Sequence, residues 1–244
     1  MVDLSAVYDA FRRHYNVGFQ FSGGRDSTAA LYLLRDFWDR MTVYHLDTGD
    51  QFPETREVVR QVESDMGRPL HKIYGHVHDI RMAHGLPSDL VPVDNTFPGL
   101  KVSGLALPIQ GRYECCYRSL MKPMQDRMLE DGITLIVRGQ RDDEYASPPM
   151  RSGDVEGGQE VLYPIQHWTG QQVSDYLNAH DLPIAAFYAR GMRRSPECMG
   201  CTAWWDEGRG EYLKQYHPQW FPVYENAMSV VREAVDRQYA FLKE

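Results

Sequence analysis

A glycine-rich turn between an apolar stretch and a helical pattern is the feature that most constrains the fold of this chain. Residues 16–21 predict a short buried strand, Ser22-Gly23-Gly24 interrupts it, and residues 26–40 carry apolar side chains at helical spacing. Glycines let a backbone approach an anion, hydroxyls donate to its oxygens, and a helix N-terminus adds N–H groups and a favourable dipole. An ordinary capped turn does not require two glycines, two serines and a threonine together. The loop therefore predicts a phosphate site.

Predicted strands and helices alternate along the rest of the chain. Apolar stretches of strand length lie at residues 41–49, 69–75 and 133–139. Helical patterns occupy residues 4–15, 53–66, 116–132 and 169–182. Gly67 should end one helix, Thr169 should cap another, and Pro123 should lie in a first turn or kink its helix. The alternation predicts an α/β fold: a Rossmann-like parallel sheet with helices on both faces.

Three segments lack this alternation. Residues 75–112 show no clear period and predict an irregular excursion, whereas residues 145–161 predict a turn-rich loop. The tail from residue 204 is rich in aromatic residues, as core or dimer contacts often are, and ends in a long helical pattern. We therefore expect a main domain over residues 1–203 and a helical C-terminal extension over residues 204–244, with a homodimer as one expected assembly.

Composition narrows the class of protein. The sequence is 43% hydrophobic and 25% charged, and it shows neither an apolar run of about 18 residues nor the basic start and apolar block of a signal peptide. We therefore expect a soluble, cytoplasmic protein with no membrane contact. A net charge of −8 argues against a large nucleic-acid footprint formed by this chain alone. A small anionic substrate or a protein partner is the better expectation.

The four cysteines form two close pairs, Cys115-Cys116 and Cys198-x-x-Cys201. In a reducing compartment this arrangement indicates a metal site before a disulfide. Tetrahedral zinc accepts four thiolates, although its sites more usually take two spaced pairs than adjacent cysteines. Four buried free thiols are the other alternative, which is disfavoured because every cysteine of the chain belongs to the pattern.

Several motifs together resemble a known family. The loop "SGGRDS" resembles the PP-loop of the adenine-nucleotide alpha-hydrolase superfamily, whose members bind ATP and usually release pyrophosphate. The next segment, "LDTGDQFPET", resembles the phosphoadenylylsulfate (PAPS) reductase family. Further similar motifs follow in the family's order: "CCYRSLMKP", "RGQRDDE", "YPIQHWTGQQVSDYLNAHDLP" and "SPECMGCT". The resemblance covers about residues 16–203, which would then form a nucleotide-binding domain.

The resemblance implies roles for individual residues. An adenine nucleotide, as ATP, PAPS or adenylylsulfate (APS), would be held at strand ends by Ser22, Gly23, Gly24, Arg25, Asp26, Ser27, Thr28, Asp47, Thr48, Gly49, Arg138 and Gly139. Asp26 would act through Mg²⁺. Cations such as Lys122, Arg118 and Arg141 would meet the charge of the transition state, so that Asp26, Lys122 and Arg141 are the expected catalytic residues.

The spacing of the cysteine pairs is similar to that of [4Fe-4S] sulfonucleotide reductases. It implies that Cys115, Cys116, Cys198 and Cys201 ligate a [4Fe-4S] cluster, for which four thiolates are sufficient. Zinc remains the alternative. Because four-thiolate ligation leaves no open iron, we expect the cluster to tune local charge or to hold two parts of the chain together.

Two departures from the family pattern bear on function. Family reductases carry a further cysteine in a Glu-Cys-Gly-Leu-His segment, whereas this sequence has none after Cys201. Family reductases also often carry degenerate PP-loops, whereas this loop is complete. Both features favour ATP-dependent activation, by adenylylation and pyrophosphate release, coupled to sulfur transfer from a sulfur donor. The alternatives are PAPS or APS reduction with a thiol supplied by a partner protein, and a non-catalytic nucleotide-binding or redox-sensing subunit.

Overall fold

The computed structural model describes residues 4–90, 109–144, 150–241 and 243. The chain forms two compact units, each built from separate segments. Unit 1 comprises Met1–Leu46, Pro53–Ile73 and Met124–Ala186. Unit 2 comprises Asp47–Phe52, Tyr74–Pro123 and Phe187–Glu244. The predicted division into residues 1–203 and 204–244 concerns sequence domains and stays a prediction.

A six-stranded sheet with the order β3-β2-β1-β6-β8-β7 forms the centre of unit 1. Its strands are β1 (Val17–Gln20), β2 (Met41–Asp47), β3 (His71–Tyr74), β6 (Leu135–Arg138), β7 (Val155–Glu156) and β8 (Gln159–Leu162). β1 pairs in parallel with both β2 and β6, and β6 pairs in parallel with β8. The short edge strand β7 runs antiparallel to β8. The predicted α/β fold with a mainly parallel sheet is confirmed.

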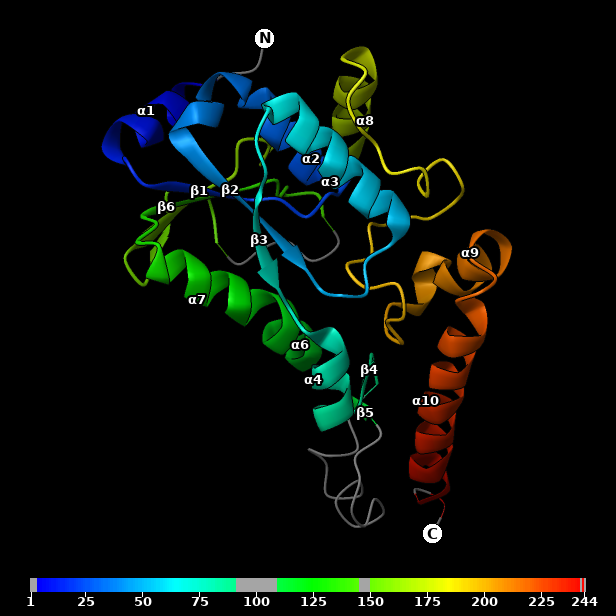
Figure 1. Cartoon of the computed structure of the whole chain (residues 1–244). Coiled ribbons are helices and arrows are strands. Elements are labelled where there is room, and N and C mark those ends of the chain that lie inside the picture. The colour runs from blue at the N-terminus through cyan, green and yellow to red at the C-terminus, as the bar shows by residue number, and fades with distance from the viewer. Residues whose placement is uncertain (1–3, 91–108, 145–149, 242, 244) are drawn as a thin grey trace. The chain divides into compact units, whose positions relative to one another are not determined.

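Helices cover both faces of this sheet. They are α1 (Ser5–Arg13), α2 (Arg25–Leu33), the 3₁₀ helix η1 (Arg35–Arg40), α3 (Pro53–Met66), α7 (Lys122–Glu130) and α8 (Gly170–Ala179). Figure 1 shows α7 on one face and α2 with α3 on the other. Gly18 of β1 faces Met128 of α7, which leaves no room for a Cβ atom at position 18. Phe19, the next residue, points to the opposite face and is fully buried.

Local helix signals in the sequence are confirmed. Thr169 caps α8 in a capping box, in which the Gln172 N–H donates to Thr169 Oγ1 at 3.2 Å. Pro53 begins α3, and Gly67 follows its end with a φ of 65°. Pro123 is the second residue of α7, which continues directly from the π-helix of residues 117–121.

Unit 2 contains shorter elements and one long helix. They are α4 (Val77–His84), β4 (Leu86–Ser88), β5 (Ile109–Gly111), α6 (Arg112–Cys116), the π-helix η3 (Tyr117–Met121), the 3₁₀ helix η4 (Trp205–Glu207), α9 (Arg209–Tyr216) and α10 (Phe221–Phe241). β4 and β5 pair in parallel. Val231 and Ala234 of α10 pack with Ile109 in one buried cluster. The predicted long helix at the C-terminal end is confirmed.

Three expectations about local structure are wrong in part. The described part of residues 75–112 is not irregular, because it forms α4, β4 and β5; residues 91–108 lie outside the described residues. The predicted loop over residues 145–161 contains the hairpin of β7 and β8, whereas residues 145–149 lie outside the description. Gly157 and Gly158 form its turn with φ values of 58° and 83°. The predicted helix over residues 116–132 is interrupted by the π-helix.

Across the residues that the structure describes, every helix is too short or too polar to cross a lipid bilayer.

Candidate functional site

The predicted phosphate loop joins the carboxyl end of β1 to the start of α2. Gly23 has a φ of 83°, which favours glycine, and Gly24 precedes α2 in an extended conformation. The hydroxyls of Ser27 and Thr28 donate back to the Gly24 carbonyl at 3.0 and 2.9 Å. Within the described residues no side chain caps α2. The first N–H groups of this helix are therefore available to an anion, and the phosphate site itself stays a prediction.

Thr55 of α3 packs directly against this loop. A Cβ atom on Gly23 would lie 2.9 Å from Thr55 Cγ2, so glycine is required for space as well as for conformation. Thr55 is only 3% exposed, and its Oγ1 has no hydrogen-bond partner among the described residues. A buried hydroxyl without a partner is costly unless it meets a polar ligand. Thr55 is a site residue that sequence patterns missed, although its place in the "FPET" motif was a signal for it.

The end of β6 lies against the same loop. Gly139 approaches the peptide group between Asp26 and Ser27, where a Cβ atom would lie 2.5 Å from the Asp26 carbonyl oxygen. Arg138, the last residue of β6, has its pKa lowered by burial, and its Nε is buried without a partner within the described ranges. Gln140 Oε1 is also buried, and it has no hydrogen-bond partner within the described ranges. The structure thus brings Gly139 to the loop residues, whereas the Arg138 side chain interacts with Tyr163, and its expected contact with a nucleotide stays a prediction.

Asp26 is bound by a buried arginine from the loop after β6. Arg141 Nε donates to Asp26 Oδ1 at 2.6 Å, and the Arg141 guanidinium, 10% exposed, also pairs with Asp143. Glu144 Oε1 accepts the Arg141 backbone N–H at 3.0 Å. Burial, and after it the charge of Asp26, raise the pKa of Glu144. Carboxylate oxygens of this kind suit Mg²⁺, which usually takes one or two carboxylates together with substrate phosphates.

The four cysteines come together in unit 2. Cys115 and Cys116 end α6, and Cys198 and Cys201 lie in the loop before η4. Cys115, Cys198 and Cys201 belong to one buried cluster, and all four thiols are free. Burial and the neighbouring Cys201 and Cys115 raise the pKa of Cys116 to about 12. The expected grouping of both pairs into one place is therefore present, and their role as metal ligands stays a prediction.

Within the described residues no three His, Cys, Asp or Glu side chains are arranged to hold a metal ion. The surroundings of the cysteines nevertheless contain buried donors. Arg81, Arg112 and Arg209 each carry at least one buried guanidinium nitrogen that has no partner in the described structure. Arg81 acts on Cys115 and Cys198, Arg112 on Cys116 and Arg209 on Cys201 through their charges. Such donors suit an anionic group with several acceptor atoms.

The last residue of β2, Asp47, and the segment that follows it to Phe52 belong to the unit that contains the cysteines. Asp47 Oδ1 accepts the Gly49 N–H at 2.8 Å, which closes a turn. Thr48 Oγ1 donates to the carbonyl of Glu197 at 3.2 Å. Gly200 N–H donates to Asp50 Oδ2 at 3.0 Å. Thr48 and Asp50 therefore hold the loop of Cys198 and Cys201. The expected contact of Asp47, Thr48 and Gly49 with a nucleotide stays a prediction.

Of the three expected catalytic residues, the structure pairs Asp26 with Arg141. Lys122, the exposed first residue of α7, belongs to unit 2. Arg118, an expected cation, donates from Nη1 to the buried Gln110 Oε1 at 2.7 Å. A transition-state role for Lys122 or Arg118 remains a prediction.

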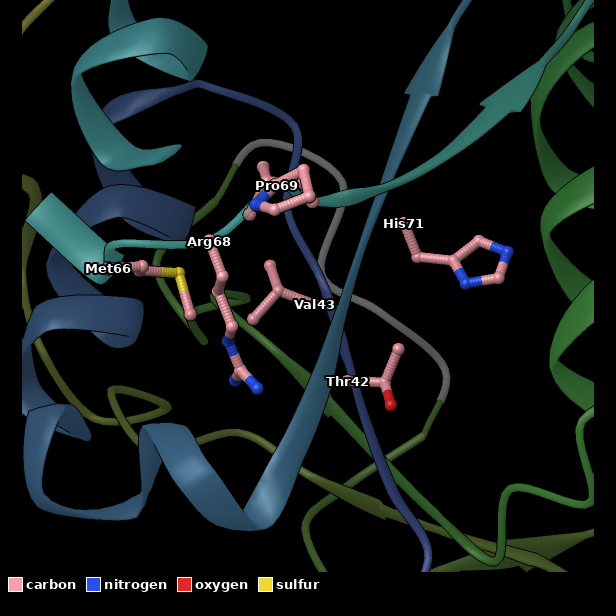
Figure 2. A pocket seen from close by; sticks show the side chains of 7 residues that line it. Thr42, Val43, Met66, Arg68, Pro69 and His71 are labelled. Carbon is pink, nitrogen blue, oxygen red and sulfur yellow. The ribbon is translucent and has the colours of Figure 1, made fainter. Parts of the chain in front are cut away.

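Figure 2 shows a pocket on unit 1. It is lined by Thr42, Val43, Met66, Arg68, Pro69, Leu70 and His71. Thr42 and Val43 lie near the amino end of β2, whereas the phosphate loop follows the carboxyl end of the parallel strand β1. Arg68 Nη2 donates to the Met41 carbonyl at 2.9 Å, so its guanidinium serves the backbone at this edge. Ligands of open α/β sheets bind at the opposite, carboxyl edge.

Comparison with known proteins gives one family. The profile of the phosphoadenosine phosphosulfate reductase domain matches residues 16–204. The adenosine 5'-phosphosulfate reductase of Salinibacter ruber is 25% identical over 189 residues, which are 77% of this chain and 68% of that protein. The protein of the same name from Deinococcus radiodurans is 27% identical over 164 residues, 67% of this chain and 57% of its own length.

Two solved structures share the fold. A phosphoadenylyl-sulfate reductase from Candida auris, in a phosphate complex, has a TM-score of 0.54 at 17% identity and covers 78% of this chain and 85% of its own. An FMN adenylyltransferase from Candida glabrata, with FMN and an ATP analogue, has a TM-score of 0.50 at 12% identity and covers 78% of this chain and 57% of its own.

Proposed function

Since the chain belongs to the phosphoadenosine phosphosulfate reductase domain family, we propose that it binds an adenylylated sulfate, APS or PAPS, and reduces the sulfate group with an external thiol. The sequence favours ATP-dependent sulfur transfer and leaves this reduction as an alternative. The relatives named as adenosine 5'-phosphosulfate reductases support reduction. The observation that carries the proposal is the gathering of all four cysteines of the sequence in unit 2.

Unit 1 would hold the nucleotide. The uncapped N-terminus of α2 offers N–H groups to phosphate oxygens, and the Thr55 hydroxyl and Arg138 Nε supply further buried donors. Mg²⁺ would be held by the carboxylate of Asp26 together with substrate oxygens. Arg141 would orient that carboxylate through its 2.6 Å contact with Asp26.

The proposed chemistry is a nucleophilic displacement at sulfur. A thiolate attacks the sulfate sulfur, an S–S bond forms, and the bond from sulfur to the nucleotide oxygen breaks, so that AMP or adenosine 3',5'-bisphosphate leaves. A second thiol then attacks the thiosulfonate, which releases sulfite and leaves a disulfide as the oxidised product. Donors of the loop would stabilise the charge that develops on the leaving group. If the four cysteines ligate a cluster, the attacking thiol lies outside these 244 residues, in a thiol-bearing partner or segment.

The cysteines would hold a [4Fe-4S] cluster. Each thiolate of such a cluster ligates a different iron, so the four sulfurs need not converge on one point, and the buried arginine donors around them suit its anionic sulfurs. A bound cluster would supply local charge and would link α6 to the loop of Cys198 and Cys201. The chain's own part is to present four thiolates inside a dry, arginine-lined site.

A second candidate is ATP-dependent adenylylation coupled to sulfur transfer. The specific observation in its favour is the complete loop from Ser22 to Ser27, with Asp26 bound to a buried arginine. In this reaction an acceptor oxygen attacks the α-phosphate of ATP and pyrophosphate leaves. A non-catalytic nucleotide-binding or redox-sensing subunit is the third candidate.

One experiment separates the three candidates. Protein purified without oxygen is given APS, PAPS or ATP with Mg²⁺ and a dithiol, and sulfite and pyrophosphate are followed. Sulfite from APS or PAPS supports reduction. Pyrophosphate from ATP without sulfite from either substrate overturns it in favour of adenylylation. The assay is repeated with thioredoxin in place of the dithiol. Nucleotide binding without sulfite or pyrophosphate under either condition overturns both catalytic candidates in favour of a binding subunit.

A further inference from the structure

Arg81 of α4 is a buried cation whose acidic partner, Asp50, also contacts the loop of Cys198 and Cys201. Its side chain is 9% exposed, and Nη1 donates to Asp50 Oδ2 at 2.7 Å; the Asp50 side chain is equally buried. Nε and Nη2 are buried and have no partner among the described residues. Buried donors without an acceptor lose their bonds to water and gain nothing in return, which destabilises the fold. The guanidinium is therefore positioned for acceptors other than Asp50.

Backbone contacts place this ion pair at the loop of Cys198 and Cys201. Gly200, between the two cysteines, donates its N–H to Asp50 Oδ2, and the Met199 N–H donates to the Asp50 carbonyl at 2.5 Å. A Cβ atom on Gly200 would lie 3.4 Å from Arg81 Nη1. Asp50 therefore fixes both the arginine and the turn that carries the cysteines.

The other cysteine pair also faces Arg81. Val77, one turn before Arg81 on α4, is buried in the cluster that contains Cys115, Cys198 and Cys201. The Arg81 charge acts to lower the pKa of Cys115, against the effect of burial. The nearest chemistry available to the unpartnered N–H groups is thus sulfur from both pairs.

We propose that Arg81, oriented by Asp50, donates hydrogen bonds to the sulfurs of the cluster held by the four cysteines and raises its reduction potential. This inference rests on the cluster of the proposed function. Reduction adds one negative charge to the cluster, and a buried cation with N–H···S contacts stabilises the more negative state. Asp50 acts in the opposite sense, because its carboxylate offsets part of the arginine charge.

Substitutions of Arg81 and of Asp50 should shift the reduction potential in opposite directions, which gives a test. Arg81→Gln removes the cation and leaves Asp50 unbalanced, so the reduction potential falls. Asp50→Asn removes the carboxylate and leaves Arg81 unbalanced, so the potential rises. Both variants break the same ion pair, so a merely structural role predicts the same direction for both. Arg81→Lys keeps the charge but has fewer fixed donors. Its reduction potential should therefore lie between those of wild type and Arg81→Gln.

The measurement is a dye-mediated redox titration of the reconstituted 244-residue chain, followed by electron paramagnetic resonance. Arg232→Gln, which breaks an exposed ion pair on α10, is the matched control and should leave the potential unchanged. If the reduction potential shifts equally in Arg81→Gln and Asp50→Asn, or does not shift, the inference about Arg81 is overturned, whereas the proposed cluster is not. If Arg81→Gln fails to retain a cluster, three proteins decide in its place. The inference then requires that the reduction potential of Arg81→Lys is lower than that of wild type, and that the potential of Asp50→Asn is higher. Wild-type protein that binds no iron and sulfide after anaerobic reconstitution overturns the cluster itself.

Discussion

Gly139 lies so close to Asp26 that a Cβ atom at position 139 would stand 2.5 Å from the Asp26 carbonyl oxygen. The contact joins the end of β6 to the first turn of α2, two segments far apart in the sequence. It sets the position of the peptide group that follows the glycine turn. The shape of the proposed phosphate site therefore depends on a residue outside the loop.

Gly139→Ala should distort the loop, since the facing atoms are backbone and cannot turn away. We expect a loss of about 1–3 kcal/mol in the free energy of unfolding, as for an overpacked site, with weaker binding of adenine nucleotide. Thermal unfolding and calorimetric titration measure the two effects. Gly170→Ala is the control, because its Cβ atom would be 3.7 Å from the nearest atom, Arg141 Nη1. Identical behaviour of the two variants would refute the role of Gly139.

Thr55→Val should raise stability and lower nucleotide affinity together. The substitution keeps the shape but removes a buried hydroxyl that has no partner in the described structure. We expect a gain of up to about 1 kcal/mol in stability, and an affinity lower by about tenfold if the hydroxyl donates to a phosphate. Thr28→Val is the contrast, because its hydroxyl donates to Gly24 at 2.9 Å and its loss should lower stability. Unchanged affinity in Thr55→Val would remove Thr55 from the site.

Asp26 and Arg141 should be energetically coupled. In a double-mutant cycle of Asp26→Asn and Arg141→Gln, we expect a coupling of about 1–3 kcal/mol in unfolding free energy, because the arginine is buried. Glu57 and Arg60 on α3 form an exposed pair, for which a coupling below about 0.5 kcal/mol is expected. Urea unfolding of wild type and the six variants gives both values. Equal coupling in the two pairs would show that Arg141 does not fix Asp26.

Glu144 should make stability fall as pH rises. Burial and the Asp26 charge raise its pKa above the ordinary value of 4.5, so the folded state holds the proton more tightly than the unfolded state. Stability is therefore lost as the pH rises from that value through the raised pKa, and the loss persists above it. Glu144→Gln keeps the acceptor for Arg141 and removes the ionisation. Its melting temperature should match wild type near pH 4 and exceed it near pH 8; a constant difference would contradict the assignment.

Cys116→Ser should lose iron and sulfide together with activity. The other three thiols lie in one buried cluster, and three thiolates leave a four-iron cluster incompletely ligated. Absorption spectroscopy and iron analysis after anaerobic purification test this. Ser229→Ala on the exposed face of α10 is the control. A Cys116→Ser protein that keeps its cluster and full activity would exclude Cys116 as a ligand.

Much of unit 1 follows from short-range patterns. The turn at Ser22-Gly23-Gly24, the capping box at Thr169 and the ends of α3 depend on residues within a few positions, so their physics is visible in the sequence. The hairpin of β7 and β8 was also encoded locally: the Gly157-Gly158 turn was available as a signal. By contrast, α4 buries only Val77 among its residues. Its pattern is therefore too weak to predict a helix.

The sequence by itself determined the glycine turn, the alternation of strands and helices and the two cysteine pairs, because dihedral preference and hydrophobic period act over short stretches of chain. Only the tertiary structure decided that Thr55 and Gly139 pack on the loop, that Arg141 binds Asp26, and that Arg81 and Asp50 lie at the cysteine loop. These contacts join residues that are far apart along the chain, and burial of their polar atoms makes each partner matter. No local pattern carries such pairings, since they depend on how the whole chain closes.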